Sequence, residues 1–194
     1  MSAYWLMSFE LAFLGMLQHG PRLLGPFLTR KLCHTVSGAC MLFLNPSDLH
    51  SRLFVYLVSI VSLLMTWELY LHKLWFGSSR DIGITIYLIL VAVWFSLQLP
   101  TYVLAPVFFA DPAGAVFGKL MTRFKLNKRW FGDKTVAGTF AVFLVAFWTL
   151  AVREFAPRVA LAALTALVEA IGGRYDNFFI AIVSIFGWWG FQKM

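Results

Sequence analysis

Long apolar runs constrain this chain more than any other feature. Residues 53–71 and 82–99 are two such runs, and a helix of roughly 20 apolar residues crosses the hydrocarbon core of a bilayer. Only 13% of the 194 residues are charged and 60% are hydrophobic, whereas soluble domains carry roughly 25% charged residues. Because the chain cannot supply the polar surface of a water-soluble fold, we expect a helical membrane protein.

Charged residues, prolines and glycines divide the apolar runs into eight predicted membrane helices. These cover residues 3–18, 33–45, 53–72, 82–99, 101–118, 136–152, 159–171 and 178–191. Several are shorter than a full span of roughly 17 to 25 residues, so the predicted fold is an all-α bundle of about seven or eight transmembrane helices. No internal repeat or linker marks a boundary, and one integral-membrane domain over residues 1–194 is therefore expected.

The basic residues predict the sidedness of the loops. If successive helices alternate in direction, one side of the membrane receives all but four of the 16 Lys and Arg residues, the exceptions being Arg52, Arg153, Arg158 and Lys193. Cytosolic loops are enriched in these cations, so the basic loops are expected in the cytosol and the N-terminus outside. The host membrane is expected to be a bacterial cell membrane or an ER-type membrane. The cations lie between apolar runs and not along one face, so the net charge of +7 does not indicate a nucleic-acid partner.

Carboxylates inside apolar segments are costly and therefore indicate function. Four residues qualify: Glu10, Glu68, Asp111 and Glu169. Asp111 is the most informative, because the proline and glycine that follow it in the segment 110–114 predict a broken helix that water and a metal ion can reach. An acidic side chain beside such backbone suggests a metal site.

Further residues suited to a nucleotide phosphate are expected at the same membrane face, around a loop with six cations at residues 119–134. They are Gly118, Lys119, Lys134, Thr135, Asp176 and Asn177. Glycines let backbone approach phosphate, lysines neutralise it, helix N-termini offer N–H donors, and carboxylates hold Mg²⁺. The sequence therefore predicts a nucleotide phosphate site, although Ala110, Gly114 and Gly118 at a spacing of four equally fit a close contact between helices.

A second group lies at the cytosolic end of the second predicted helix. Arg30 and Lys31 there are either an anchor at the membrane surface or phosphate ligands. His34 is either a metal ligand or base, or a residue that forms a hydrogen bond between helices.

Four motifs follow one another along the chain. Residues 30–38 fit R-K-x-x-H-x-x-x-G in full, and residues 110–119 keep the Asp, the second Gly and the basic residue of G-D-x-x-A-x-x-x-G-[RK]. Residues 134–139 keep all but the Glu of K-[ST]-x-E-G-[ST], and Glu169 with the Asp-Asn pair at 176–177 completes the series. In this order the motifs resemble the CTP-dependent polyprenol and lipid kinase family, which includes phytol kinase, dolichol kinase and the yeast-type diacylglycerol kinase.

The resemblance implies transfer of the γ-phosphate of CTP, with Mg²⁺, to the hydroxyl of a lipid alcohol dissolved in the bilayer. It assigns Asp111 and Asp176 to Mg²⁺, and Asn177 and His34 to orienting the ligands. It assigns phosphate binding to Arg30, Lys31, Gly118, Lys119, Lys134, Thr135 and Gly138. Either Asp111 or His34 would accept the alcohol proton, and Lys134 would act in catalysis. Because dolichol kinases are much longer, the short chain favours a phytol-like isoprenoid alcohol or diacylglycerol as substrate.

Three other functions stay open. One is transfer of CMP, as in phosphatidate cytidylyltransferases. Another is a small transporter in which Glu10, Glu68 and Asp111 line a path across the bilayer. The third is a member of the kinase family that binds its ligands without turnover, because Ala137 replaces the Glu of the third motif.

Overall fold

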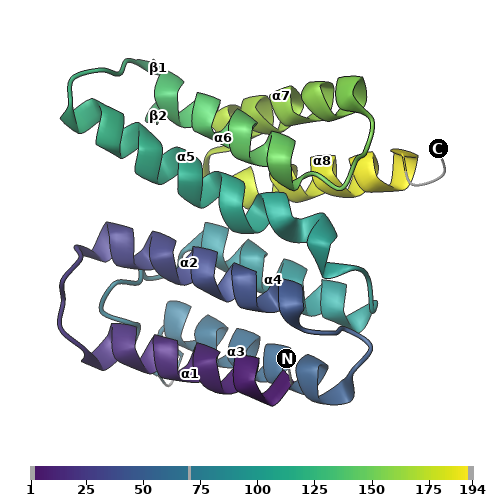
Figure 1. Ribbon diagram of the computed structural model, residues 1–194. Coiled ribbons are helices and arrows are strands. Elements are labelled where there is room, and N and C mark those ends of the chain that lie inside the picture. The colour runs from purple at the N-terminus through teal and green to yellow at the C-terminus, as the bar shows by residue number, and fades with distance from the viewer. Residues whose placement is uncertain (1–2, 70, 192–194) are drawn as a thin grey trace. The chain divides into compact units, whose positions relative to one another are not determined.

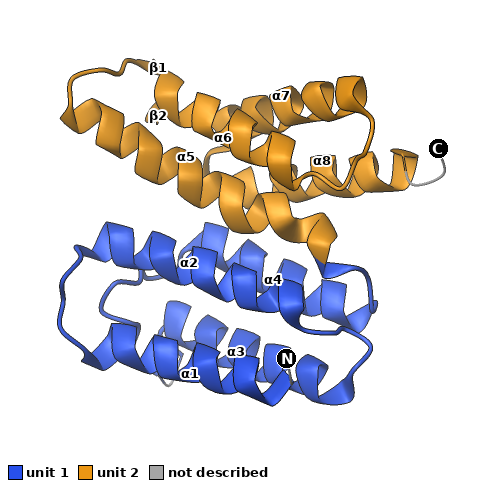
Figure 2. Ribbon diagram, in the orientation of Figure 1, with its two compact units in different colours: residues 1–101 blue, residues 102–194 orange. Residues whose placement is uncertain are grey.

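The computed structural model describes residues 3–69 and 71–191, and most of them are helical (Figure 1). The chain divides into two compact units, residues 1–101 and 102–194 (Figure 2). The predicted all-α class agrees with this architecture, apart from one short hairpin. That residues 1–194 form a single domain stays a prediction.

Unit 1 is built from four helices that alternate in direction (Figure 1). They are α1 (Ala3–His19), α2 (Pro26–Phe43), α3 (Leu49–Thr66) and α4 (Ile82–Ser96). Local signals set three of their starts: Pro26 occupies the first turn of α2, while the Asp48 and Asp81 carboxylates accept hydrogen bonds from the backbone N–H groups of Ser51 and Ile84. Proline and aspartate are favoured at these positions because they suit the unpaired N–H groups of a first turn.

Unit 2 contains the other helices and a small antiparallel hairpin. Its elements are η1 (Thr101–Leu104, a 3₁₀ turn that begins at the unit boundary), α5 (Ala105–Arg123), β1 (Arg129–Phe131), β2 (Lys134–Thr135), α6 (Val136–Thr149), α7 (Phe155–Gly172), η2 (Gly173–Tyr175) and α8 (Asp176–Phe191). Helix α5 packs against α6 and α8, and α7 packs against both α6 and α8. The core is rich in alanine, with Ala110, Ala146, Ala162 and Ala166 around Val142, and such small side chains let helices approach closely.

Glycines make the contact between α5 and α6 unusually close. A Cβ atom on Gly118 would lie 2.6 Å from Thr135 Oγ1, and one on Gly138 would lie 2.8 Å from the carbonyl oxygen of Gly114. Real Cβ atoms do not approach other heavy atoms so closely, so only glycine fits at these positions. The interpretation of residues 110–118 as a small-residue helix contact is confirmed.

The connection between α5 and α6 is ordered by backbone geometry. Lys125 has a φ of 58°, and the N–H groups of Lys125 and Leu126 donate to the carbonyls of Thr122 and Met121, a glycine-type helix ending formed here by lysine. Beyond it, β1 and β2 pair through Phe131 and Lys134 around a two-residue turn, in which Gly132 has a φ of 51°. The sequence predicts only a loop here, because strands of three and two residues are too short to show an alternating pattern.

Each of the eight predicted helical segments overlaps a helix of the structure, and the differences lie at the ends. Helix α2 begins at Pro26 and not at residue 33, and α3 ends at Thr66 and not at residue 72. Helix α5 runs on through Pro112 to Arg123, so the predicted break after Asp111 is wrong. The proline lacks one N–H donor, but the residues around it are buried and this packing maintains the helix.

Among the described residues, three helical stretches are long and apolar enough to cross a membrane: Leu49–Thr66, Thr101–Arg123 and Phe155–Phe191. The last includes α7, the turn η2 and α8. The apolar helices Ile82–Ser96 and Val136–Thr149 are shorter. These lengths and compositions are the structural support for a membrane protein, while the seven or eight crossings stay a prediction.

Candidate functional site

Three carboxylates from distant parts of the sequence meet at one end of unit 2. Asp111 comes from α5, Glu169 from the last turn of α7 and Asp176 from the start of α8. One oxygen atom of each lies within 4.8 Å of one from each of the others. Asp111 and Glu169 are almost fully buried, at 5% and 3% exposure. The short turn η2 joins the end of α7 to the start of α8, and α5 packs against α8, which brings Asp111 to the other two carboxylates.

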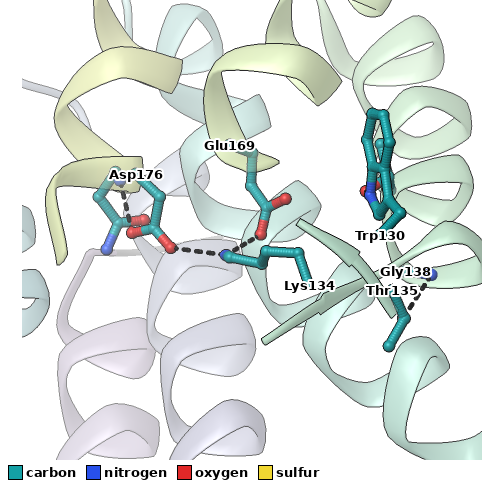
Figure 3. A network of polar contacts seen from close by, with 8 residues as sticks. Trp130, Lys134, Thr135, Gly138, Glu169 and Asp176 are labelled. Atoms are coloured by element: carbon teal, nitrogen blue, oxygen red, sulfur yellow. Dashed lines mark hydrogen bonds and ion pairs between the residues drawn. The ribbon is translucent and has the colours of Figure 1, made fainter. Parts of the chain in front are cut away.

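Lys134 lies against this cluster from β2. Its Nζ donates to Glu169 Oε1 and to Asp176 Oδ2, the latter at 3.1 Å (Figure 3). Burial alone would lower the pKa of Lys134, but the charges of Glu169 and Asp176 outweigh this effect and raise the pKa above its ordinary value. Lys134 is therefore held as an ammonium ion.

The backbone next to Lys134 is fixed from both sides. The hydroxyl of Thr135 accepts a hydrogen bond from the N–H of Gly138 at 3.2 Å and caps α6. Asn127 Nδ2 donates to the carbonyl of Gly118 at 3.0 Å, and Asn127 Oδ1 accepts from the N–H of Ala137 at 3.1 Å. Asn127 thus ties the end of α5 to the start of α6.

The donor set fits a hard divalent cation. All three acidic groups offer carboxylate oxygens, the ligands that Mg²⁺ prefers. Three carboxylates packed this closely repel one another when ionised, and a divalent cation between them would relieve that repulsion. Asp111, Glu169 and Asp176 are therefore the residues that would hold Mg²⁺.

The structure brings together four of the residues singled out from the sequence: Asp111, Lys134, Glu169 and Asp176. Asn177 is buried next to Asp176, and its backbone N–H donates to Asp176 Oδ1. Lys119 is exposed near the end of α5.

The remaining residues of unit 2 that were predicted to bind phosphate have structural roles. Gly118 and Gly138 form the close contact between α5 and α6, and Thr135 caps α6. Their predicted contacts with phosphate stay predictions.

The role of two residues is not predicted from the sequence. The position of Glu169 in an apolar helix and in the last motif indicates function but does not assign it to the metal, although the same signal could place it there. Asn127 was not singled out, because a single asparagine in a polar loop carries no sequence signal of its role.

The candidates from the first motif belong to unit 1 and lie in α2. Arg30 Nη1 contacts Asp81 Oδ2 at 2.7 Å and Ser78 Oγ at 3.1 Å. The ring of His34 packs edge-on against that of Tyr87, with the centroids 4.4 Å apart. Arg30 therefore has a structural role within unit 1. Phosphate binding by Arg30 and Lys31, and the role of His34 in orienting the ligands or accepting the alcohol proton, stay predictions.

The other two carboxylates occupy different environments. Glu10 is buried in α1 at 1% exposure. Glu68 lies beyond the end of α3, where Ser79 Oγ donates to it at 2.7 Å, and this bond together with nearby Lys73 lowers the pKa of Glu68. Because Glu68 sits in an exposed loop and not within a helix, the transporter interpretation lacks one of its three residues.

Comparison with known proteins gives no relative from which the role of this cluster could be inferred. No protein-family model, curated protein or solved structure matches the chain. The arrangement of Asp111, Lys134, Glu169 and Asp176 is therefore the basis for a functional proposal.

Proposed function

We propose that this chain is an integral-membrane lipid kinase that transfers the γ-phosphate of CTP to the hydroxyl of a lipid alcohol. The observation that carries the proposal is the buried cluster of Asp111, Glu169 and Asp176 with Lys134 bound to two of them. Phosphoryl transfer depends mainly on positioning and on neutralising charge. A carboxylate set for Mg²⁺ beside a fixed ammonium supplies the groups for both tasks.

The residues divide the work between metal and phosphate. Asp111, Glu169 and Asp176 would hold Mg²⁺, which would supply positive charge against the negative charge of the phosphates. Lys134, which contacts Glu169 and Asp176 in the structure, would turn to the phosphates, assisted by Lys119. The N-termini of α6 and α8 open at the same end and offer further N–H donors.

The reaction needs one proton acceptor. As the alcohol oxygen bonds to the γ-phosphorus, the bond from that phosphorus to the β-bridging oxygen breaks, and CDP leaves. The hydroxyl proton passes to Asp111 or His34. A phytol-like isoprenoid alcohol or diacylglycerol would reach the site sideways from the bilayer.

The proposed topology has seven or eight crossings, with the N-terminus outside and the site facing the cytosol. The distribution of cations in unit 2 supports it. The hairpin connection and Arg174 lie at the end that holds the cluster, whereas Arg153, in the connection between α6 and α7, and Arg158, in the first turn of α7, lie at the other end. Such asymmetry is typical of cytosolic loops.

The pairing of Lys134 supports an active enzyme despite Ala137. Lys134 has two carboxylate partners, Glu169 and Asp176, without a Glu at position 137. If the Glu of the third motif serves to hold Lys134 in the kinase family, Glu169 from α7 and Asp176 from α8 hold Lys134 in this chain. An Ala137→Glu variant then gains no activity, whereas a rise in turnover would favour the interpretation of a chain impaired by Ala137.

The test is a transfer assay with purified protein, Mg²⁺ and CTP labelled in either the α- or the γ-phosphate. Phytol, farnesol, diacylglycerol and phosphatidate are the acceptors. Label from the γ-position in one alcohol is the expected result, whereas label from the α-position in phosphatidate would establish transfer of CMP instead. No label in any lipid from folded protein would refute both.

Variants locate the activity. Asp111→Asn and Lys134→Ala are expected to abolish transfer while the protein stays folded in detergent. Arg153→Gln, an exposed cation at the other end of unit 2, is the matched control and should retain full activity. Unchanged activity in both site variants would show that the cluster is not the catalytic site.

A further inference from the structure

The segment that joins α5 to β2 exposes large apolar side chains next to cations. We call residues 123–131 the basic-aromatic tip. Its apolar members are Phe124, Leu126, Trp130 and Phe131, which are 60%, 74%, 51% and 51% exposed. Its cations, all exposed, are Arg123, Lys125, Lys128 and Arg129.

The tip has a defined backbone. The left-handed residue Lys125 closes α5, and the pairing of Phe131 with Lys134 closes the hairpin. Asn127, the one half-buried residue of the tip, ties it to the ends of α5 and α6. Trp130 Nε1 donates to Thr139 Oγ1 at 3.0 Å, which orients its ring. The exposed side chains therefore project from an ordered support.

The charge of the tip is unbalanced. Within the described stretch 122–133, Asp133 is the one acidic residue, and its carboxylate lies 3.9 Å from Arg129 Nη1 with both side chains largely in solvent. A surface pair of this kind neutralises little. The tip therefore carries a net positive charge directly beside its exposed aromatic rings.

We propose that the basic-aromatic tip docks into the headgroup layer of an anionic phospholipid surface. The four cations would contact lipid phosphates, while Phe124, Leu126, Trp130 and Phe131 would enter the interface below them. Aromatic rings favour this depth, and long cationic side chains reach outward from it. The inference is independent of nucleotide chemistry and goes beyond the proposed kinase activity.

A lipid surface fits better than a soluble polyanion. A free nucleotide or polyphosphate would satisfy the cations but leave four large apolar side chains in water, at a cost that grows with their exposed area. An anionic bilayer offers phosphate and an apolar layer within a few ångströms of each other. The cations of the tip match the phosphate layer of such a bilayer, and the apolar side chains between them match its apolar layer.

The test measures how deeply the tip inserts. A nitroxide is attached to Leu126→Cys in full-length protein whose native cysteines are replaced (Cys33→Ala and Cys40→Ala). The protein is reconstituted without nucleotide into vesicles of phosphatidylcholine alone or with phosphatidylglycerol. We expect oxygen accessibility to rise and accessibility to a water-soluble nickel reagent to fall when the anionic lipid is present. The change should disappear at about 1 M NaCl, where the Debye length falls to about 3 Å.

Charge variants identify the groups responsible. Each cation removed should lower the equilibrium between inserted and water-exposed states about fivefold. The variant with Arg123, Lys125, Lys128 and Arg129 all changed to Gln should keep the label in water. Lys128→Gln alone should show the single-charge effect, and the matched control Arg153→Gln should show none. Melting of each purified variant verifies that it is folded.

Three results would overturn the inference. One is insertion that is equal in neutral and anionic vesicles, which would indicate apolar anchoring without recognition of charge. Another is a label that stays in water in every vesicle. The third is a four-cation variant that loses affinity for pyrophosphate or CTP while the label position is unchanged, which would assign the cations to a soluble ligand.

Discussion

Lys134 controls the electrostatic balance of the carboxylate cluster. It is the cation that contacts both Glu169 and Asp176, whose side chains are only 4% and 14% exposed. Removing one partner of a buried ion pair leaves the other charge without compensation. Loss of Lys134 is therefore expected to destabilise the site.

A Lys134→Met variant should be less stable by about 2–3 kcal/mol, at the lower end for broken buried pairs because the lysine is 26% exposed. Mg²⁺ should then raise the melting temperature of the variant more than that of the unchanged protein, because the freed carboxylates bind it without a competing ammonium. Thermal melts with and without Mg²⁺ measure both effects, and Lys134→Arg is the control that keeps the charge. Equal shifts in both proteins would argue against a metal site.

Asn127 should contribute to stability through its bridging hydrogen bonds. An Asn127→Ala variant leaves the carbonyl of Gly118 and the N–H of Ala137 without this partner, and we expect a loss of about 1–2 kcal/mol. The neighbouring variant Lys128→Ala changes an exposed side chain and should stay within about 0.5 kcal/mol. Denaturant or thermal unfolding in detergent compares the two, and losses of equal size would contradict the bridging role.

Site residues were predictable where they broke the surrounding pattern. Asp111 and Lys134 stand out from apolar or loop sequence, and Asp176 begins a helix. Glu169 lies 58 residues from Asp111 along the chain, and sequence alone does not show which carboxylates converge. Asn127 acts through hydrogen bonds to backbone groups of other segments, which the identity of a single residue does not reveal.

At the level of elements, the close crossing of α5 and α6 holds the site together. Gly138→Ala would place a methyl group 2.8 Å from the Gly114 carbonyl oxygen and 2.9 Å from Thr135 Oγ1. Because the backbone at Gly114 can move only at a large energetic cost, we expect the free energy of unfolding to fall by about 1–3 kcal/mol. Gly190→Ala meets nothing within 4 Å and should be neutral or stabilising by up to about 1 kcal/mol. Melting temperatures test the pair, and a neutral Gly138→Ala would show that the helices can separate.

Helices were predictable as elements, but not their ends. Apolar runs located every helix, because burial in a bilayer or a core demands such runs. The cations Arg30 and Lys31 suggested a later start for α2 than Pro26 sets, and the cap residue Asp48 was overlooked before α3. Pro112 suggested a break that packing prevents. The hairpin depends on a turn of two residues at Gly132, a signal too local for periodicity to detect.

For the whole molecule, the sidedness of the loops is the most direct property to test. In a background with Cys33→Ala and Cys40→Ala, Lys125→Cys should react with a membrane-impermeant maleimide only from the cytosolic side. Arg153→Cys should react only from the outside, since Lys125 lies in the connection before α6 and Arg153 in the connection after it. Intact cells and inverted vesicles provide the two sides, and permeabilised cells are the control in which both should react. Labelling of both positions from one side would refute the alternating topology.

Lys134 follows Phe131 by three residues on the same two-stranded hairpin. Because a turn of only two residues joins the strands, a displacement of the aromatic side chains on β1 would be expected to move Lys134 on β2 as well. The short β1–β2 hairpin thus connects the exposed turn to the buried carboxylates. If the proposed docking and the proposed kinase activity both hold, lipids that displace β1 would also move Lys134 on the paired strand β2, and turnover would depend on the composition of the leaflet.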